Sequence, residues 1–300
     1  MKKVLLCAAF IAASFTSIAQ VGVGTTTPEA ALDVVSTNSG VLLPRVANIA
    51  AVTTPVNGML IYDELRNCFK GFENGAWTSC FSDQAGPTDV VSSTGRTWMD
   101  RNLGATEVAT SSQDFASYGD LYQWGRAADG HQVIVRDAAT PAEGAPPTGS
   151  SGNTSTIATS ATAGHGDFVL GASTAGIDNN WTNFTEENGL WQAGLNDPCP
   201  AGYRIPTETE LNNERLSWGT NNAAGAMNSP LKLPLAGYRS HEDNWLWEVG
   251  SIGNYWTSTV GINEDTGSST DARYLYFDSS FSDMESFYRA EGHSVRCIKD

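Results

Sequence analysis

The amino-acid sequence predicts a mainly β, loop-rich protein of the α+β class. The chain has 300 residues, among them 30 glycines and 9 tryptophans, and few of its segments show the helical period of apolar residues. Short runs of strand-forming residues are instead separated by Gly, Asn, Ser and Asp, which is the pattern of β-proteins. The length allows one large domain or two modest ones.

Residues 1–19 have the composition of an export signal. Two lysines precede a mostly apolar run from Val4 to Phe15, and the tripeptide Ser-Ile-Ala that ends at Ala19 has the small-x-small form of a signal-peptidase site. The apolar run is too short to span a bilayer. We therefore expect cleavage after Ala19 and a protein that is secreted or held at the cell surface.

The charge of the chain limits its partners. The formal net charge is -16 at pH 7, which makes nucleic acid and anionic membrane surfaces poor partners. No other segment is apolar for long enough to cross a membrane. We expect no nucleic-acid partner and no membrane span.

The N-terminal segment, residues 20–82, is predicted to be extended and to contain a β-hairpin. The run Val-Gly-Val-Gly-Thr-Thr-Thr-Pro from Val21 onward resembles the short repeat at the start of many bacterial surface proteins and phage-fibre-like chains. In those proteins the repeat forms extended, often trimeric stalks, so the resemblance implies a homotrimer formed through this segment. Gly22 and Gly24 do not indicate a nucleotide loop, because no strand precedes them and no further Gly completes the pattern.

The dipeptide Asn74-Gly75 predicts the turn of the hairpin. A two-residue loop would place Cys80 opposite Phe69, whereas a three-residue loop would place Cys80 opposite Cys68. Since the second register lets the cysteines bond, we expect the three-residue loop.

The cysteines suggest disulfides. Outside the export signal they are Cys68, Cys80, Cys199 and Cys297, an even number in an exported chain, and four cysteines allow three connectivities. We favour Cys68–Cys80 and Cys199–Cys297.

A linker rich in Ser, Asp, Gln, Gly and Pro is expected at residues 83–89, followed by a second domain at 90–300. In that domain Thr207 and Glu210 fit a capping box, and Pro206 favours an extended residue before it. These signals predict a helix from Glu208 to Leu216.

Strand-sized segments bounded by turn residues are expected along the chain. They are Met59–Tyr62, Leu231–Leu235, Trp245–Val249, Tyr255–Val260, Arg273–Asp278 and Ser294–Ile298. Residues 138–176 are rich in Ala, Thr, Ser and Gly without periodicity, so we expect a long surface excursion there.

An ordered set of motifs runs through the second domain. The set is Trp98-Met99-x-x-Asn102-Leu103-Gly104, Asp197-Pro198-Cys199-Pro200-Ala201-Gly202-Tyr203-Arg204-Ile205-Pro206-Thr207, Leu235-Ala236-Gly237-Tyr238-Arg239, Tyr255-Trp256-Thr257-Ser258-Thr259 and Ser294-Val295-Arg296-Cys297. Together, over residues 90–300, they resemble the Fibrobacter succinogenes major paralogous domain family. The resemblance implies a C-type-lectin-like domain with small twisted antiparallel sheets, one or two helices and long loops. It also implies a disulfide between an early helix region and the final strand, and no single established activity.

The sequence contains no catalytic constellation. The histidines at 131, 165, 241 and 293 lie outside any His-Glu-x-x-His or nucleophile-elbow setting, and we expect His293 to be a packing or rim residue. Formylglycine-generating oxidases, which share the implied fold, carry a closely spaced pair of reactive cysteines, whereas Cys297 stands alone. We therefore expect no enzyme, with an oxidase as the disfavoured alternative.

No cofactor is expected, and Ca²⁺ is the one ion left open. The lectin motifs Glu-Pro-Asn, Gln-Pro-Asp and Trp-Asn-Asp are absent. The loop Asn263-Glu264-Asp265 with Asp271 could supply oxygen ligands. Asp178-Asn179-Asn180 begins like a calcium loop but lacks the later Gly and Glu. A solvated acidic loop is the stronger interpretation of both segments.

Two loop-like segments, Ser240–Gly253 and Ser279–Gly292, are aromatic and polar, and binding residues often lie on loops above a rigid scaffold. Trp245 and Trp247 would share one face of a strand and could bind a sugar or a peptide through their rings, although burial in the core is the commoner role of tryptophan. The ligand-binding candidates are Arg239, Trp245, Trp247, Asn254, Tyr276, Asp278 and Tyr288.

These features favour an exported, non-catalytic ligand-binding or adhesion module whose partner is a glycan or a surface protein. The alternative is a structural surface-fibre component that makes protein–protein contacts.

Overall fold

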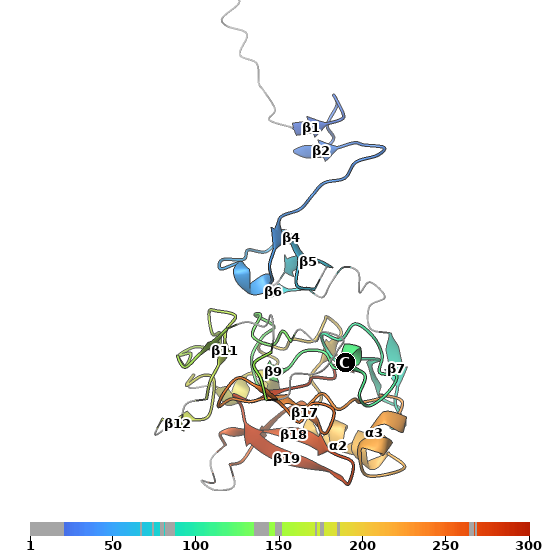
Figure 1. The fold of residues 1–300 in the computed structure, drawn as a ribbon, viewed down its shortest axis with the longest axis vertical. Helices are drawn as coiled ribbons and strands as arrows, with labels where there is room; N and C mark the ends of the chain where they lie inside the picture. The colour runs from blue at the N-terminus through green and yellow to red at the C-terminus, as the bar shows by residue number, and fades with distance from the viewer. Residues whose placement is uncertain are drawn as a thin grey trace, which may run out of the picture. The chain divides into compact units, whose positions relative to one another are not determined.

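A computed structural model describes residues 21–66, 68–73, 75–78, 81, 88–134, 144–147, 152–171, 173–174, 177–184, 187–263, 267 and 269–300. The chain divides into two compact units, Met1–Leu43 and Pro44–Asp300, and Figure 1 shows the fold of each. The predicted export signal, most of the predicted linker and Cys80 lie outside the described residues.

The first unit contains one small parallel sheet. Strand β1 (Val21–Val23) pairs with β2 (Leu32–Val34). Gly24 follows β1 with a φ of 76°, and a Cβ at this position would lie 2.0 Å from the carbonyl oxygen of Val35. Only glycine therefore fits the turn that leaves β1.

The second unit begins with a four-stranded sheet in the order β3 (Arg45–Val46), β4 (Met59–Asp63), β5 (Cys68–Glu73) and β6 (Ala76–Trp77). Strand β4 confirms the strand predicted at Met59–Tyr62. One face of the sheet packs into a small core that contains Ile49, Ile61, Phe72, Trp77 and Val133. This core joins the hairpin to a segment more than fifty residues further along the chain.

The predicted hairpin register is wrong. Glu73 pairs with Ala76 and Phe72 with Trp77, which leaves two residues in the turn instead of three. Gly75 has a φ of 81°, the conformation that short hairpin turns require. Cys68 is disulfide-bonded, and its predicted partner Cys80 lies outside the described residues.

Three further sheets combine strands from distant parts of the chain. One has the order β14-β21-β8-β7, another β16-β15-β20-β9, and the third β17-β18-β19. Their bounds are β7 (Asp89–Val91), β8 (Thr97–Met99), β9 (Tyr122–Gln123), β14 (Tyr203–Arg204), β15 (Tyr238–Arg239), β16 (Leu246–Trp247), β17 (Gly253–Gly261), β18 (Asp271–Phe277), β19 (Ser282–Tyr288), β20 (Gly292–His293) and β21 (Ile298–Lys299).

Shorter elements complete the described chain. They are the strand pairs β10 (Asn153–Thr154) with β11 (Phe168–Val169) and β12 (Ser173–Thr174) with β13 (Ile177–Asp178), the 3-10 turns η1 (Ile49–Ala51), η3 (Phe115–Ser117), η4 (Glu187–Gly189) and η5 (Trp191–Ala193), and the helices α2 (Glu208–Leu216) and α3 (Ala223–Asn228).

Helix α2 confirms the predicted helix and its capping box. The Thr207 hydroxyl accepts a hydrogen bond from the Glu210 amide, and the Glu210 carboxylate accepts one from the Thr207 amide at 2.9 Å. The helix packs against β17, β18 and β19, as Figure 1 shows. Its buried Leu211 joins Trp98, Tyr255 and Phe277 in one core cluster.

The disulfide Cys199–Cys297 is confirmed. Its Cα atoms are 5.9 Å apart, and it links positions separated by 98 residues. Cys297 is fully buried in the largest core cluster, beside Val295 and several tryptophans. Trp98, Trp124 and Trp256 have no exposed surface.

The predicted C-type-lectin-like fold is wrong. The chain is mainly β and loop-rich, as its composition predicts, but its small sheets are arranged like a four-bladed propeller. The segment Ser294–Ile298 is not the single final strand that such a domain implies. The chain instead leaves one sheet after β20 and enters another at β21.

Two loop and strand predictions also fail. The three leucines of Leu231–Leu235 are buried, but the segment forms no strand, because Pro234 cannot donate to a ladder. The predicted loop Ser279–Gly292 contains β19, which pairs with β18 along its whole length.

Candidate functional site

The sheet of the first unit exposes an apolar face. Val21 lies opposite Leu32 and Val23 opposite Val34. Alternate residues of a strand point to the same side, so these four side chains share one face. Their exposed fractions are 55%, 60%, 52% and 37% in that order. We call this surface the stalk face.

The first sheet of the second unit also exposes apolar side chains. Leu60, Tyr62 and Phe69 lie on the side opposite the buried Ile61, and the rings of Tyr62 and Phe69 meet edge to face at 5.0 Å. Leu60 is 45% and Phe69 43% exposed. Most of the exposed large apolar side chains among the described residues lie in the N-terminal third of the chain. They are Val21, Val23, Leu32, Val34, Val35, Val41, Leu42, Val56, Leu60, Phe69 and Val91.

The structure brings together two of the predicted ligand-binding residues, Trp245 and Trp247. Their rings stack with centroids 5.9 Å apart and an angle of 29° between planes. Leu246, between them, is buried in a core cluster, so both indoles lie on the outer side of β16. Trp245 is exposed and Trp247 is half-buried.

Two other ligand-binding candidates lie in the interior. Arg239 has no exposed surface; its Nε donates to Asn244 Oδ1 at 2.8 Å and its Nη1 to the His131 carbonyl at 2.6 Å. The guanidinium lies 4.1 Å from the centre of the Phe168 ring. Burial lowers the pKa of Arg239 to about 9. Asn254 is 4% exposed.

The remaining candidates lie on the β18–β19 hairpin. The Tyr276 hydroxyl donates to Asp278 at 3.0 Å, and the other oxygen of Asp278 accepts from the amides of Ser280 and Phe281. Asp278 therefore shapes the turn between the strands. Tyr288, at the far end of β19, is half-buried.

A buried histidine–carboxylate pair has no counterpart in the sequence predictions. His241 Nδ1 contacts Glu291 Oε2, and the His241 amide donates to the same oxygen at 2.9 Å. Burial raises the pKa of Glu291. A base paired with a carboxylate can activate a nucleophile, but among the described residues no serine, threonine or cysteine side chain hydrogen-bonds to His241. The pair joins the loop after β15 to the segment before β20.

His293 is a packing residue, as predicted. It is 2% exposed, and its ring stacks on Trp256 at 4.1 Å. Burial and the neighbouring His241 hold the pKa of His293 well below its ordinary value.

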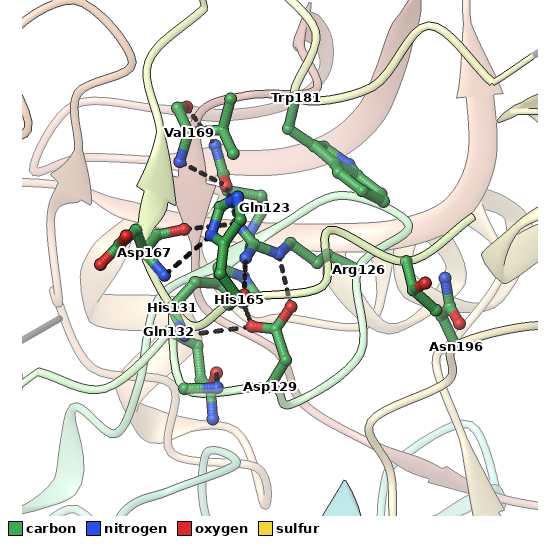
Figure 2. Close-up of polar contacts among 12 residues, drawn as sticks. Gln123, Arg126, Asp129, His131, Gln132, His165, Asp167, Val169, Trp181 and Asn196 are labelled. Carbon is green, nitrogen blue, oxygen red and sulfur yellow. Dashed lines mark hydrogen bonds and ion pairs between the residues drawn. The ribbon is translucent and has the colours of Figure 1, made fainter. Parts of the chain in front are cut away.

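Figure 2 shows a polar network centred on the buried Arg126. Nε of Arg126 donates to Asp129 at 2.8 Å, and Nη1 donates to Gln123 Oε1 at 2.8 Å and to the Asp167 carbonyl at 2.9 Å. Nη2 donates to the His165 carbonyl at 2.7 Å. One guanidinium thus joins the turn after β9 to the segment that precedes β11.

His131 belongs to the same network and is neutral. Its Nδ1 lies 2.7 Å from Asp129 Oδ1, and its Nε2 accepts from the Gln123 amide at 3.0 Å. Because Nε2 is an acceptor, the ring carries its proton on Nδ1. Burial lowers the pKa of His131 to about 4. The network is suited to holding loops in place and not to proton transfer near neutral pH.

The predicted acidic loops are only partly described. Asn263 Nδ2 donates to Asp271 at 3.3 Å, and both residues are buried, while Glu264 and Asp265 lie outside the described residues. Within the described part of the chain, no group of three or more His, Cys, Asp or Glu side chains could hold a metal ion. No helix there is long and apolar enough to cross a membrane.

Comparison with known proteins places one part of the chain in context. Residues 22–94 match the family described as a phage tail like trimerisation region. The match contains most of the stalk face and the whole first sheet of the second unit. No curated protein and no solved structure matches the chain.

Proposed function

We propose that this protein is an exported structural component of a surface fibre. Three chains assemble through the N-terminal region, and the remainder of each chain is carried by the stalk so formed and makes contacts with other proteins. The stalk face carries the proposal, because it is apolar and exposed in the single chain, and all of it except Val21 lies within the residues that resemble a trimerisation region.

The energetics of the stalk face support assembly with further copies. A two-stranded sheet is at best marginally stable in water. Burying one valine or leucine side chain stabilises by about 1.5–3 kcal/mol, so covering the stalk face would offset the cost of ordering these residues. A second copy of the same chain offers the matching apolar surface.

The mass of the assembly in solution tests the proposal. Residues 20–300 should elute as a species three times the mass of one chain when measured by light scattering after size exclusion. Val21→Asp with Val23→Asp should give single chains. Leu195→Asp, which changes a side chain of similar exposure in the second unit (51%), should leave the trimer intact. A monomeric wild type would refute the assembly.

The location of the protein tests the export half of the proposal. A mature N-terminus at Gln20, found by sequencing protein from the medium or the cell surface, is the expected result. Full-length protein that stays inside the cell would contradict it.

A further inference from the structure

The described tryptophans differ sharply in their surroundings. Trp124, Trp181, Trp191 and Trp256 each donate their indole N–H to a backbone carbonyl in the interior. Among the tryptophans of the described residues, Trp245 is the exposed one, with 38% of its surface accessible. Covering a large apolar ring with a ligand removes it from water, which favours binding.

The loop that carries Trp245 is held rigidly. The Ser240 amide donates to the Trp245 carbonyl at 2.8 Å, and the Asn244 amide donates to the Ser240 carbonyl at 3.0 Å. Asn244 adopts a φ of 67° and its side chain accepts from the buried Arg239. The His241 amide is bonded to Glu291. Binding a ligand here would therefore require little further ordering of the loop.

The exposed Trp245 ring, which stacks on Trp247, has polar and aromatic neighbours. Tyr238 lies opposite Trp247 across the β15–β16 pair, so its side chain is on the same face. Both oxygens of Asp243 lie 3.4 Å from the indole nitrogen of Trp247, and Asp243 also accepts from the Trp245 amide at 3.0 Å. The neighbouring Glu242 and Glu248 are exposed.

This geometry selects one class of ligand. A pyranose ring presents a face of C–H groups that can cover an indole, and its hydroxyls can donate to carboxylates at the edge. Acidic sugars would be repelled by the carboxylates. Binding of an organic cation usually involves aromatic rings that surround it as a cage, whereas the two indoles here are within 29° of parallel.

We propose that Trp245, stacked on Trp247 beside Tyr238 and bordered by Asp243, Glu242 and Glu248, is a binding platform for a neutral pyranose sugar. The platform lies in the second unit and goes beyond the proposed assembly, so it does not depend on the stalk face.

Calorimetric titration of residues 20–300 tests the platform. The probes are cellohexaose, maltohexaose, xylohexaose and chitohexaose as neutral sugars, with oligogalacturonate and tetramethylammonium as the charged probes. At least one neutral sugar should bind, and Trp245→Ala should weaken that binding by about tenfold or more. Trp245→Phe should retain part of the affinity. Phe281→Ala, which removes an exposed aromatic ring elsewhere (47%), should bind like the wild type.

Each contrary outcome overturns the platform. These outcomes are no binding of any neutral sugar, equal binding by Trp245→Ala, or preference for a charged probe. Circular dichroism of Trp245→Ala should match the wild type, because an exposed ring contributes little to the core. The variant Val21→Asp with Val23→Asp should keep its affinity per chain, so failure of the trimer and failure of the platform can be told apart.

Discussion

Arg126 and Asp129 form an ion pair in which Nε of Arg126 and Oδ2 of Asp129 are 2.8 Å apart. The Arg126 side chain is 1% exposed. The other oxygen of the same carboxylate holds His131. One carboxylate therefore supports two buried groups in the turn after β9.

Replacing Asp129 by Ala should destabilise the second unit by about 3 kcal/mol, because it leaves a buried guanidinium without the partner of its Nε. Urea unfolding followed by tryptophan fluorescence measures the loss. Glu64→Ala is the matched control, since the pair Arg45–Glu64 spans 3.9 Å with both side chains more than half exposed. Its loss should stay below about 1 kcal/mol, and equal losses for the two variants would contradict the prediction.

Stability should fall as the pH falls from about 6.5 towards about 4. The pKa of His131 is about 4 in the folded chain because of burial, whereas an unfolded histidine takes up its proton near pH 6.5. Between these values the unfolded state binds more protons, so acid favours unfolding.

His293 should contribute in the same direction, because burial also holds its pKa low. Glu291 has a raised pKa and opposes the effect. Urea unfolding at several pH values should therefore give a shallower pH dependence for His293→Phe than for the wild type. An unchanged dependence would count against this assignment.

Loss of the Cys199–Cys297 bond should cost about 4–5 kcal/mol, because the bond closes a loop of 98 residues in the unfolded chain. Either single Cys→Ala variant should lose about as much as the double variant, since each removes the same bond. Urea unfolding of all three variants checks this. Additive losses would show that the two cysteines act separately.

Gly24→Ala should weaken the stalk. A Cβ at Gly24 would collide with Val35, whose amide donates to the Val23 carbonyl at 2.9 Å. The concentration at which trimers dissociate should rise by about tenfold or more, measured by light scattering across a dilution series. Gly58→Ala, also at positive φ but with nothing within 4 Å, is the control for backbone conformation alone. Identical behaviour of the two variants would contradict the clash.

Local signals predicted local structure well. Thr207 and Glu210, which form the capping box, are enough to predict where α2 begins. Strands β17 and β18 are predicted by short runs of strand-forming residues between turns. Strand β19 escaped prediction because its residues from Ser282 to Tyr288 are largely polar. That segment is a strand because β18 pairs with it, and this pairing is a tertiary contact.

The candidate sites also differ in whether the local sequence or only the fold reveals them. Trp245 and Trp247 are two residues apart, so their shared face could be predicted from strand geometry. The stalk face is also visible in the sequence, because Val-Gly-Val and Leu-Asp-Val alternate with a period of two. His241 and Glu291 are 50 residues apart, and only the fold brings them together.

The position of β20 and β21 has a consequence for the order of folding. β20 lies between β15 and β9, and β21 lies between β14 and β8. A chain that emerges N-terminus first presents the neighbours of β20 and β21 well before β20 and β21 themselves. The β16-β15-β20-β9 sheet cannot close until residue 293 has emerged, and the β14-β21-β8-β7 sheet cannot close until residue 299 has emerged. Cys199 likewise cannot form its bond until Cys297 has emerged. The part of the second unit that these two sheets hold together should therefore stay incomplete until the last residues have been delivered, which suits the export proposed above.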